Sequence, residues 1–171
     1  VCFIDIRDED AHKLVAQLSH NPGATPPRYY RCNLLNIPKL QATIKQIYTE
    51  VGAINVLINN AANDTRHDFR TVTVDYWNER LAVNLRHHFF AAQAVYPQMV
   101  ELGGGSIINL GSMSWYATQG GMPGYTSSKA AIEGLTRGLA RDMGGDNIRV
   151  NTLVPGWVMT ERQVAMLTKD K

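Results

Sequence analysis

Tyr125 and Lys129 lie four residues apart in a segment with a helical pattern. This spacing places both side chains on one face of a helix. A tyrosine has an ordinary pKa of about 10 and exchanges few protons at neutral pH, but a neighbouring ammonium group favours the phenolate and lowers that pKa. The pair could therefore serve as acid and base toward an alcohol or a carbonyl. Alone, the spacing is weak evidence for such a site, because many helices carry a tyrosine and a lysine four residues apart by chance.

Further polar residues accompany this pair at regular places. Ser112 follows a predicted strand, the run Asn59-Asn60-Ala61-Ala62 ends another, and Asn84 lies in the predicted helix between them. After a later strand comes Pro155-Gly156, with Thr160 four residues further on. As a set, these residues resemble the short-chain dehydrogenase/reductase family, and the resemblance covers essentially all 171 residues.

The resemblance implies four catalytic residues and a role for each. Tyr125 would be the general acid and base at the reacting oxygen. Lys129 would lower the pKa of Tyr125 and bind the nicotinamide ribose hydroxyls. Ser112 would form a hydrogen bond with the reacting oxygen, and Asn84 would hold a water molecule that links Lys129 to solvent.

The resemblance also implies a nicotinamide cofactor. Asp5 ends the first predicted strand, where a carboxylate in Rossmann folds binds the adenosine ribose and repels a 2′-phosphate, which favours NAD over NADP. Arg7 is close enough in sequence to leave NADP open. Asn33-Leu34 stand where the family usually has an aspartate and an apolar residue. The predicted cofactor-binding residues are Asp5, Asn33, Leu34, Asn60, Ala61, Ala62, Tyr125, Lys129, Pro155, Gly156, Val158 and Thr160.

The stretch 63–99 resembles the aldose 1-dehydrogenase branch of the family, which includes D-xylose, L-arabinose and D-galactose dehydrogenases. The residues that carry this resemblance are Asn63-Asp64, Arg66-His67, Tyr76-Trp77, Glu79-Arg80 and Asn84-Leu85-Arg86-His87. The implied reaction oxidises a sugar hemiacetal to an aldonolactone, with hydride passing from C1 to NAD. Candidate substrate contacts are Asn63, Asp64, Ser112, Trp115 and Gln119, although loop ordering or packing would explain most of them equally well.

Strand-like and helix-like segments alternate and would position these residues. Strands are predicted over 1–6, 29–34, 54–59, 106–110 and 148–154, helices over 9–18, 38–51, 75–102 and 124–143, and a loop over 21–27. This order predicts an α/β fold, a doubly wound parallel Rossmann-type sheet in a single domain over 1–171. The family's first strand and glycine-rich turn would precede Val1, so we expect a partial sheet that also lacks a C-terminal segment.

Composition excludes several other classes of function. The net charge of +2 is too small to indicate binding to nucleic acid, and the apolar runs are too short for a membrane span. Two cysteines without metal-ligand spacing, Cys2 and Cys32, favour reduced thiols in a cytoplasmic protein. His87 and His88 invite a metal site, but adjacent residues are expected on different helix faces, so no metal is predicted.

The helix over 81–100 carries apolar residues on more than one face, which predicts a symmetric partner chain in a dimer or tetramer. Two alternatives to a sugar dehydrogenase remain. One is a family enzyme that reduces another carbonyl, such as a 3-oxoacyl thioester or a ketone, which a mostly apolar pocket would favour. The other is an inactive truncated product that acts only through its oligomer surface.

Overall fold

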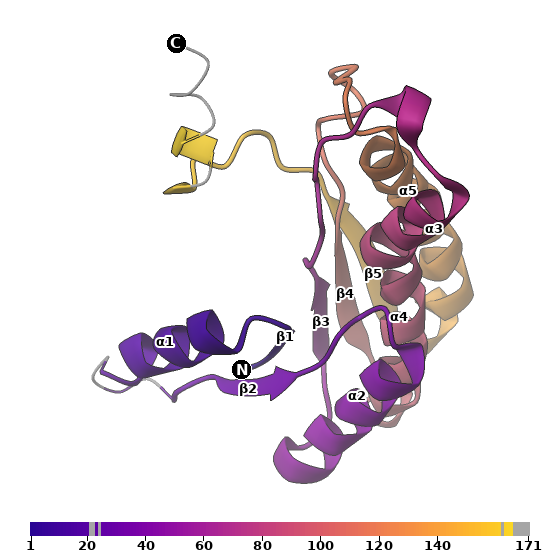
Figure 1. Ribbon diagram of the computed structural model, residues 1–171. Helices are drawn as coiled ribbons and strands as arrows, with labels where there is room; N and C mark the ends of the chain where they lie inside the picture. Colours follow the sequence, from indigo (N-terminus) through magenta and orange to yellow (C-terminus); the bar gives the residue numbers. More distant parts are fainter. Residues whose placement is uncertain (21–22, 24, 162, 166–171) are drawn as a thin grey trace.

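The computed structural model describes residues 1–20, 23, 25–161 and 163–165. Strands and helices alternate along this part of the chain (Figure 1), which confirms the predicted α/β order. Residues 21, 22 and 24 of the predicted loop lie outside the described residues. The elements are β1 Cys2–Asp5, α1 Asp8–Ser19, β2 Arg28–Arg31, α2 Ile37–Val51, β3 Val56–Asn59, η1 Phe69–Thr71, α3 Val74–Leu81, η2 Ala82–Arg86, α4 His87–Glu101, β4 Gly105–Leu110, α5 Pro123–Met143, η3 Gly144–Asp146 and β5 Ile148–Leu153.

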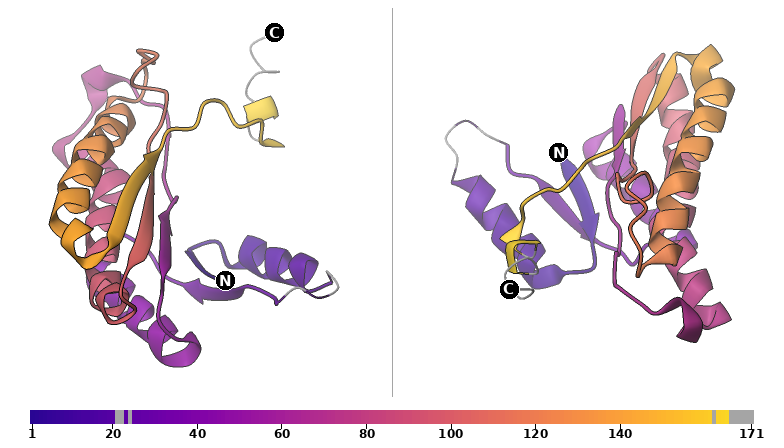
Figure 2. Two further views of the ribbon diagram at one scale, coloured as in Figure 1. Left: turned by 180° about the vertical axis from the view of Figure 1, so that it is seen from behind. Right: turned by 90° about the horizontal axis from the view of Figure 1, so that it is seen from above.

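All described strand pairs are parallel, as predicted, but they form two sheets rather than one. β1 pairs with β2, and β3, β4 and β5 form a second sheet in that order. Figures 1 and 2 show α4 and α5 against one face of the second sheet, with α1, β1 and β2 on the far side of β3. On that far side Val56, Ile58 and Leu153 are 50%, 58% and 56% exposed. The two sheets are therefore not joined by a strand pair among the described residues.

The long helix predicted over 75–102 contains a π-helical turn, η2, between α3 and α4. The Thr73 side chain caps the start of α3 by accepting a hydrogen bond from the Tyr76 amide at 3.2 Å. A π-helical turn inserts an extra residue into a helix and is common at functional sites. Asn84 lies in its middle and is fully buried.

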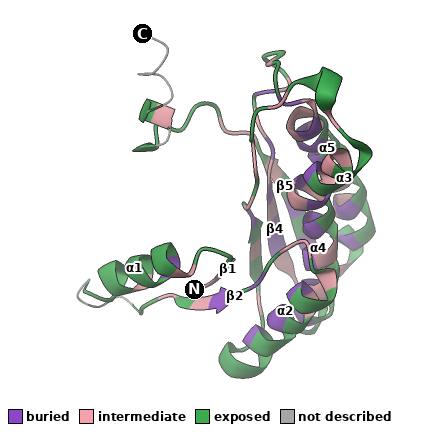
Figure 3. Ribbon diagram, in the orientation of Figure 1, coloured by how far each residue is buried: buried purple, intermediate pink, exposed green. Residues whose placement is uncertain are grey.

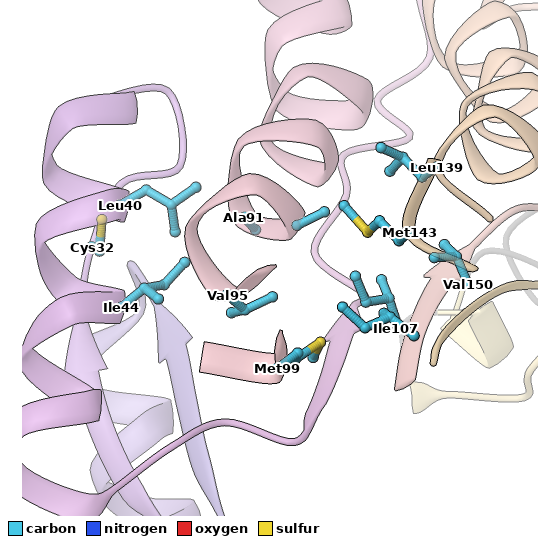
Figure 4. Packing of buried hydrophobic residues seen from close by; sticks show 12 residues of the cluster. Cys32, Leu40, Ile44, Ala91, Val95, Met99, Ile107, Leu139, Met143 and Val150 are labelled. Carbon is cyan, nitrogen blue, oxygen red and sulfur yellow. The ribbon is translucent and has the colours of Figure 1, made fainter. Parts of the chain in front are cut away.

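The hydrophobic core lies between the three-stranded sheet and the helices α2, α4 and α5. Ala92, Val95, Met99 and Ile107 have no measurable exposure, and Figure 4 shows Leu40 and Ile44 of α2 facing the same cluster. Burial is concentrated on this side of the second sheet, as Figure 3 shows. This core therefore holds α5, which carries Tyr125 and Lys129, and β4, which ends two residues before Ser112.

Among the described helices, none combines the length and the apolar composition that a bilayer-spanning helix requires. Over the same ranges, histidine, cysteine, aspartate and glutamate side chains do not gather in groups of three or more that could hold a metal ion. Cys2 and Cys32 are free thiols, and Cys32 is buried.

Candidate active site

The first turns of α5 bring Tyr125 and Lys129 together. Their spacing places both side chains toward the carboxyl end of β4, and the Lys129 ammonium nitrogen lies 5.6 Å from the centre of the Tyr125 ring. Lys129 is 1% exposed, and its Nζ donates a 2.6 Å hydrogen bond to the Leu110 carbonyl at the end of β4. Burial lowers the pKa of Lys129 to about 8. The lysine is thus a buried and anchored cation beside the phenol.

Ser112 lies two residues after β4, and its hydroxyl lowers the pKa of Tyr125. Its Oγ also accepts a 3.1 Å hydrogen bond from the Ser114 amide. Burial raises the pKa of Tyr125, and the Asp64 carboxylate adds to that rise, whereas Ser112 and Arg66 lower it. The pKa of Tyr125 is therefore raised overall, whereas Lys129 was expected from the sequence to lower it. In the chain alone, desolvation of the phenolate outweighs the groups that favour it.

Asn84 fixes the loop that follows β3. Its Oδ1 accepts a 2.7 Å hydrogen bond from the Asn63 amide, and its Nδ2 donates to the Asn63 and Arg80 carbonyls, each at 3.0 Å. The side-chain amide is therefore occupied by the main chain. Asn84 thus positions the loop after β3. The resemblance had implied only that Asn84 would hold a water molecule.

The ends of β3, β4 and β5 are tied together by a buried polar network below the site. Asn59 Nδ2 donates to Asn109 Oδ1 at 2.9 Å, and Asn109 Nδ2 donates to Thr136 Oγ1 at 3.0 Å. Thr152 Oγ1 donates to Thr136 Oγ1 at 2.8 Å, and Asn109 Oδ1 also lies 3.2 Å from His88 Nδ1. Buried networks of this kind fix relative positions because each unpaired member would cost free energy.

Besides Tyr125 and Lys129, the predicted cofactor-binding residues fall into two groups. Asp5 is the last residue of β1, and Asn33-Leu34 come after β2. Asp5 Oδ1 accepts hydrogen bonds from the Ile6 and Arg7 amides at 2.7 and 2.9 Å. The other group follows the second sheet and comprises Asn60, Ala61, Ala62, Pro155, Gly156, Val158 and Thr160. The Pro155 carbonyl accepts a 3.1 Å hydrogen bond from the Met113 amide, which joins this second group to the loop that carries Ser112.

The residues present fit the ribose and nicotinamide end of a dinucleotide. A lysine ammonium has three N–H donors, and in the described contacts of Lys129 the Leu110 carbonyl receives one of them. The others are suited to ribose hydroxyls. Val158 and Thr160 are exposed in the segment that continues from β5, which leaves them accessible to the nicotinamide.

Arg66 and His67, which were not among the predicted site residues, contact the segment that carries the candidate substrate residue Gln119. Arg66 Nη1 donates a 2.9 Å hydrogen bond to the Gly120 carbonyl, next to Gln119. The His67 amide donates a 2.7 Å hydrogen bond to the Gly121 carbonyl. These contacts join segments 54 residues apart, so a local sequence pattern could not predict them.

His87 and His88 are adjacent on α4, and their ring centres lie 4.4 Å apart. Both are buried beside Lys129. Burial, reinforced by the charge of Lys129, lowers the pKa of His87 to about 4. Burial also lowers the pKa of His88 to about 2, with His87 and Lys129 acting in the same direction. Both rings are therefore neutral near pH 7.

Comparison with known proteins gives consistent matches over the whole chain. The family model described as short chain dehydrogenase matches residues 1–171. D-xylose 1-dehydrogenase of Caulobacter vibrioides is 48% identical over 170 residues, which are 99% of this chain and 66% of that protein. A probable galactose dehydrogenase of Rhizobium meliloti is 41% identical over 163 residues, 95% of this chain and 63% of its own length. The chain thus spans slightly less than two thirds of these relatives.

Solved structures give the same result for the fold. A gluconate 5-dehydrogenase from Burkholderia cenocepacia J2315, in complex with NADP and tartrate, superimposes with a TM-score of 0.85 at 28% identity, covering 97% of this chain and 64% of that one. A 7α-hydroxysteroid dehydrogenase complexed with NADH and 7-oxo glycochenodeoxycholic acid gives 0.88 at 29% identity, covering 96% and 64%.

Proposed function

The chain belongs to the short-chain dehydrogenase family, and from this premise we propose that the full-length protein oxidises an aldose at C1 to an aldonolactone, with NAD as the hydride acceptor. The observation that carries the proposal is the convergence of Tyr125, Ser112 and Lys129 at the end of β4. This is the arrangement that a proton-transferring site for an alcohol requires, because acid–base catalysis depends first on geometry.

The proposed reaction removes a hydride from C1 and a proton from the C1 hydroxyl. The cofactor, when bound, supplies the two-electron acceptor for the hydride. The Tyr125 oxygen takes the proton from the hydroxyl, while the Ser112 hydroxyl holds the reacting oxygen. Because burial raises the pKa of Tyr125, its phenolate depends on the nearby positive charge of Lys129 and on hydrogen bonds to the phenolate oxygen.

The character of the surrounding side chains favours a polyol as substrate. Asp64 and Arg66 both influence the pKa of Tyr125, in opposite directions, so both charges lie near its hydroxyl. Asn63 is held at the end of the same loop by Asn84. Charged and amide groups suit sugar hydroxyls and would be poorly matched by the apolar body of a steroid or an acyl chain. The names of the D-xylose and galactose relatives agree with this substrate class.

The preference for NAD rests on Asp5 and on what surrounds it. The Asp5 carboxylate is exposed at the end of β1, where it suits ribose hydroxyls and opposes a 2′-phosphate. Arg7, the cation that left NADP open, forms an ion pair with Asp10. The solved neighbours were crystallised with NADP and with NADH, so the fold accommodates either cofactor.

Assembly into a homo-oligomer stays a prediction. Phe89 and Val100 of α4 are each 40% exposed, whereas other apolar residues of that helix, such as Val95 and Met99, are buried within this chain. The apolar surface that a partner could cover is therefore smaller than the helix composition indicated.

The proposal is tested by a panel of pentoses and hexoses incubated with the full-length protein and either NAD or NADP, read as absorbance of the reduced cofactor. We expect turnover of at least one aldose, faster with NAD, and an aldonolactone or its hydrolysed acid as product by mass spectrometry. The Tyr125→Phe variant should lose at least 100-fold in rate. Reduction of ketones or 3-oxoacyl thioesters without turnover of any aldose would overturn the assignment.

A further inference from the structure

A strained turn immediately precedes the catalytic helix. Residues 118–121 connect the loop after Ser112 to α5, and two of them, Thr118 and Gly121, have positive φ angles of 51° and 74°. A positive φ is uncommon for a residue with a Cβ atom, such as threonine, and persists only where surrounding contacts enforce it. Gln119, a candidate substrate residue, lies between these two positions and is half-buried.

The contacts that hold this turn come from the loop after β3. Arg66 Nη1 donates to the Gly120 carbonyl at 2.9 Å, and the His67 amide donates to the Gly121 carbonyl at 2.7 Å. A Cβ atom at Gly121 would lie 3.8 Å from Arg66 Cδ, so the arginine stem also packs over the turn. Within the turn's own loop, the Gln119 amide donates to the Ser114 carbonyl at 3.0 Å.

The residues that hold the turn are themselves anchored to the core. The Tyr76 hydroxyl lies 3.1 Å from His67 Nδ1, and the two rings pack edge to face with centres 5.0 Å apart. Thr65 donates through its amide and hydroxyl to Asn63 Oδ1 at 2.9 and 2.6 Å, and Asn84 holds the Asn63 main chain. His67 Nδ1 lies 3.1 Å from the Thr65 carbonyl, so a continuous set of polar contacts runs from the π-helical turn of the long helix to the turn before α5.

We propose that Arg66 is a positioning residue for sugar recognition, whose guanidinium fixes the 118–121 turn and thereby sets where Gln119 meets the substrate. The proposal rests on the proposed function. A glutamine amide offers two donors and an acceptor, which suits adjacent hydroxyls of a sugar ring. Displacement of such a group by about 1 Å can cost on the order of 100-fold in rate, so the anchor of the turn would control discrimination between epimers.

The test compares Arg66→Met with Arg70→Met in the full-length protein. Arg70 is a matched control because it is an exposed arginine four residues further on, in η1, and pairs with Asp68 rather than with the turn. For Arg66→Met we expect KM for the best aldose to rise about tenfold and selectivity between epimers to fall, with a smaller decrease in kcat because Arg66 also lowers the pKa of Tyr125. Arg66→Lys should restore part of the loss. Arg70→Met should match the parent protein in all three quantities.

A second measurement does not depend on turnover. Hydrogen exchange of the His67 amide, which is bonded to Gly121, should accelerate about tenfold or more in Arg66→Met and stay unchanged in Arg70→Met. Unchanged KM, epimer selectivity and His67 exchange in Arg66→Met would overturn the proposal. If the parent protein turned over no aldose, the proposed function would fail, while accelerated His67 exchange would still support the anchoring of the turn by Arg66.

Discussion

The ammonium group of Lys129 is bonded to the main-chain carbonyl of Leu110, at 2.6 Å, rather than to another side chain. Leu110 ends β4, two residues before Ser112, so the strand that presents the serine also holds the lysine. Burial lowers the pKa of Lys129 from 10.5 to about 8. Keeping the charge on this buried amine at pH 7 therefore costs about 3 kcal/mol, which indicates that its position serves function more than stability.

Replacement of Lys129 by methionine should separate its contribution to activity from its contribution to stability. We expect the activity of the full-length protein to fall by at least 100-fold. The free energy of unfolding should stay unchanged or rise by up to about 2 kcal/mol, because relief of the buried charge offsets an unpaired Leu110 carbonyl. Urea unfolding at pH 7 and cofactor-reduction assays measure the two effects. Lys45→Met, at an exposed position of α2, is the control. A loss of more than about 2 kcal/mol in Lys129→Met would contradict this account.

Replacement of Asn84 by alanine should destabilise the loop after β3. Asn84 is fully buried and makes three hydrogen bonds to the main chain of Asn63 and Arg80. Their removal leaves buried main-chain groups unpaired and should cost about 2–3 kcal/mol of unfolding free energy. The Asn63 amide should also exchange faster with solvent. Asn78→Ala, at an exposed position on α3, should change neither quantity; equal effects of the two substitutions would refute the positioning role of Asn84.

Much of the fold could be predicted from local patterns in the sequence. Buried strands such as β4 are short apolar runs, and α5 has both helical periodicity and a proline at its start. The four-residue spacing of Tyr125 and Lys129 fixes a shared face whatever the tertiary structure. Ser112 reaches the same place because β4 is a central parallel strand whose carboxyl end lies beside the start of α5.

Other features depend on contacts that sequence periodicity does not encode. The π-helical turn at Asn84 shifts the register of the helix by one residue. The spacing of apolar residues along the sequence is too irregular to reveal a shift of that size. Lys129 donates a hydrogen bond to the Leu110 carbonyl, 19 residues away in the sequence. Arg66 donates one to the Gly120 carbonyl, 54 residues away. Sequence spacing therefore located the candidate pair Tyr125 and Lys129 but could not show that burial, rather than the lysine charge, dominates the pKa of Tyr125.

Acidification should destabilise the protein through His87 and His88. Their pKa values in the folded chain are lowered from 6.5 to about 4 and about 2, mainly by burial. Between these values and 6.5 the unfolded chain binds more protons, so stability is complete above pH 6.5 and falls as the pH falls below it. At pH 5.5 each histidine should remove about 1.4 kcal/mol, or about 3 kcal/mol together. Urea unfolding between pH 7.5 and 5.5 measures this loss.

The histidine assignment can be checked with one substitution and its control. His87→Phe keeps a ring at the buried position and removes one of the two titrating groups, so the loss of stability between pH 7.5 and 5.5 should shrink by about half. His12→Phe replaces an exposed histidine of α1 and should leave the slope of stability against pH unchanged. If His87→Phe retained the full acid dependence of the parent protein, the source of that dependence would lie elsewhere in the chain, and His87 would not be held neutral by its burial beside Lys129.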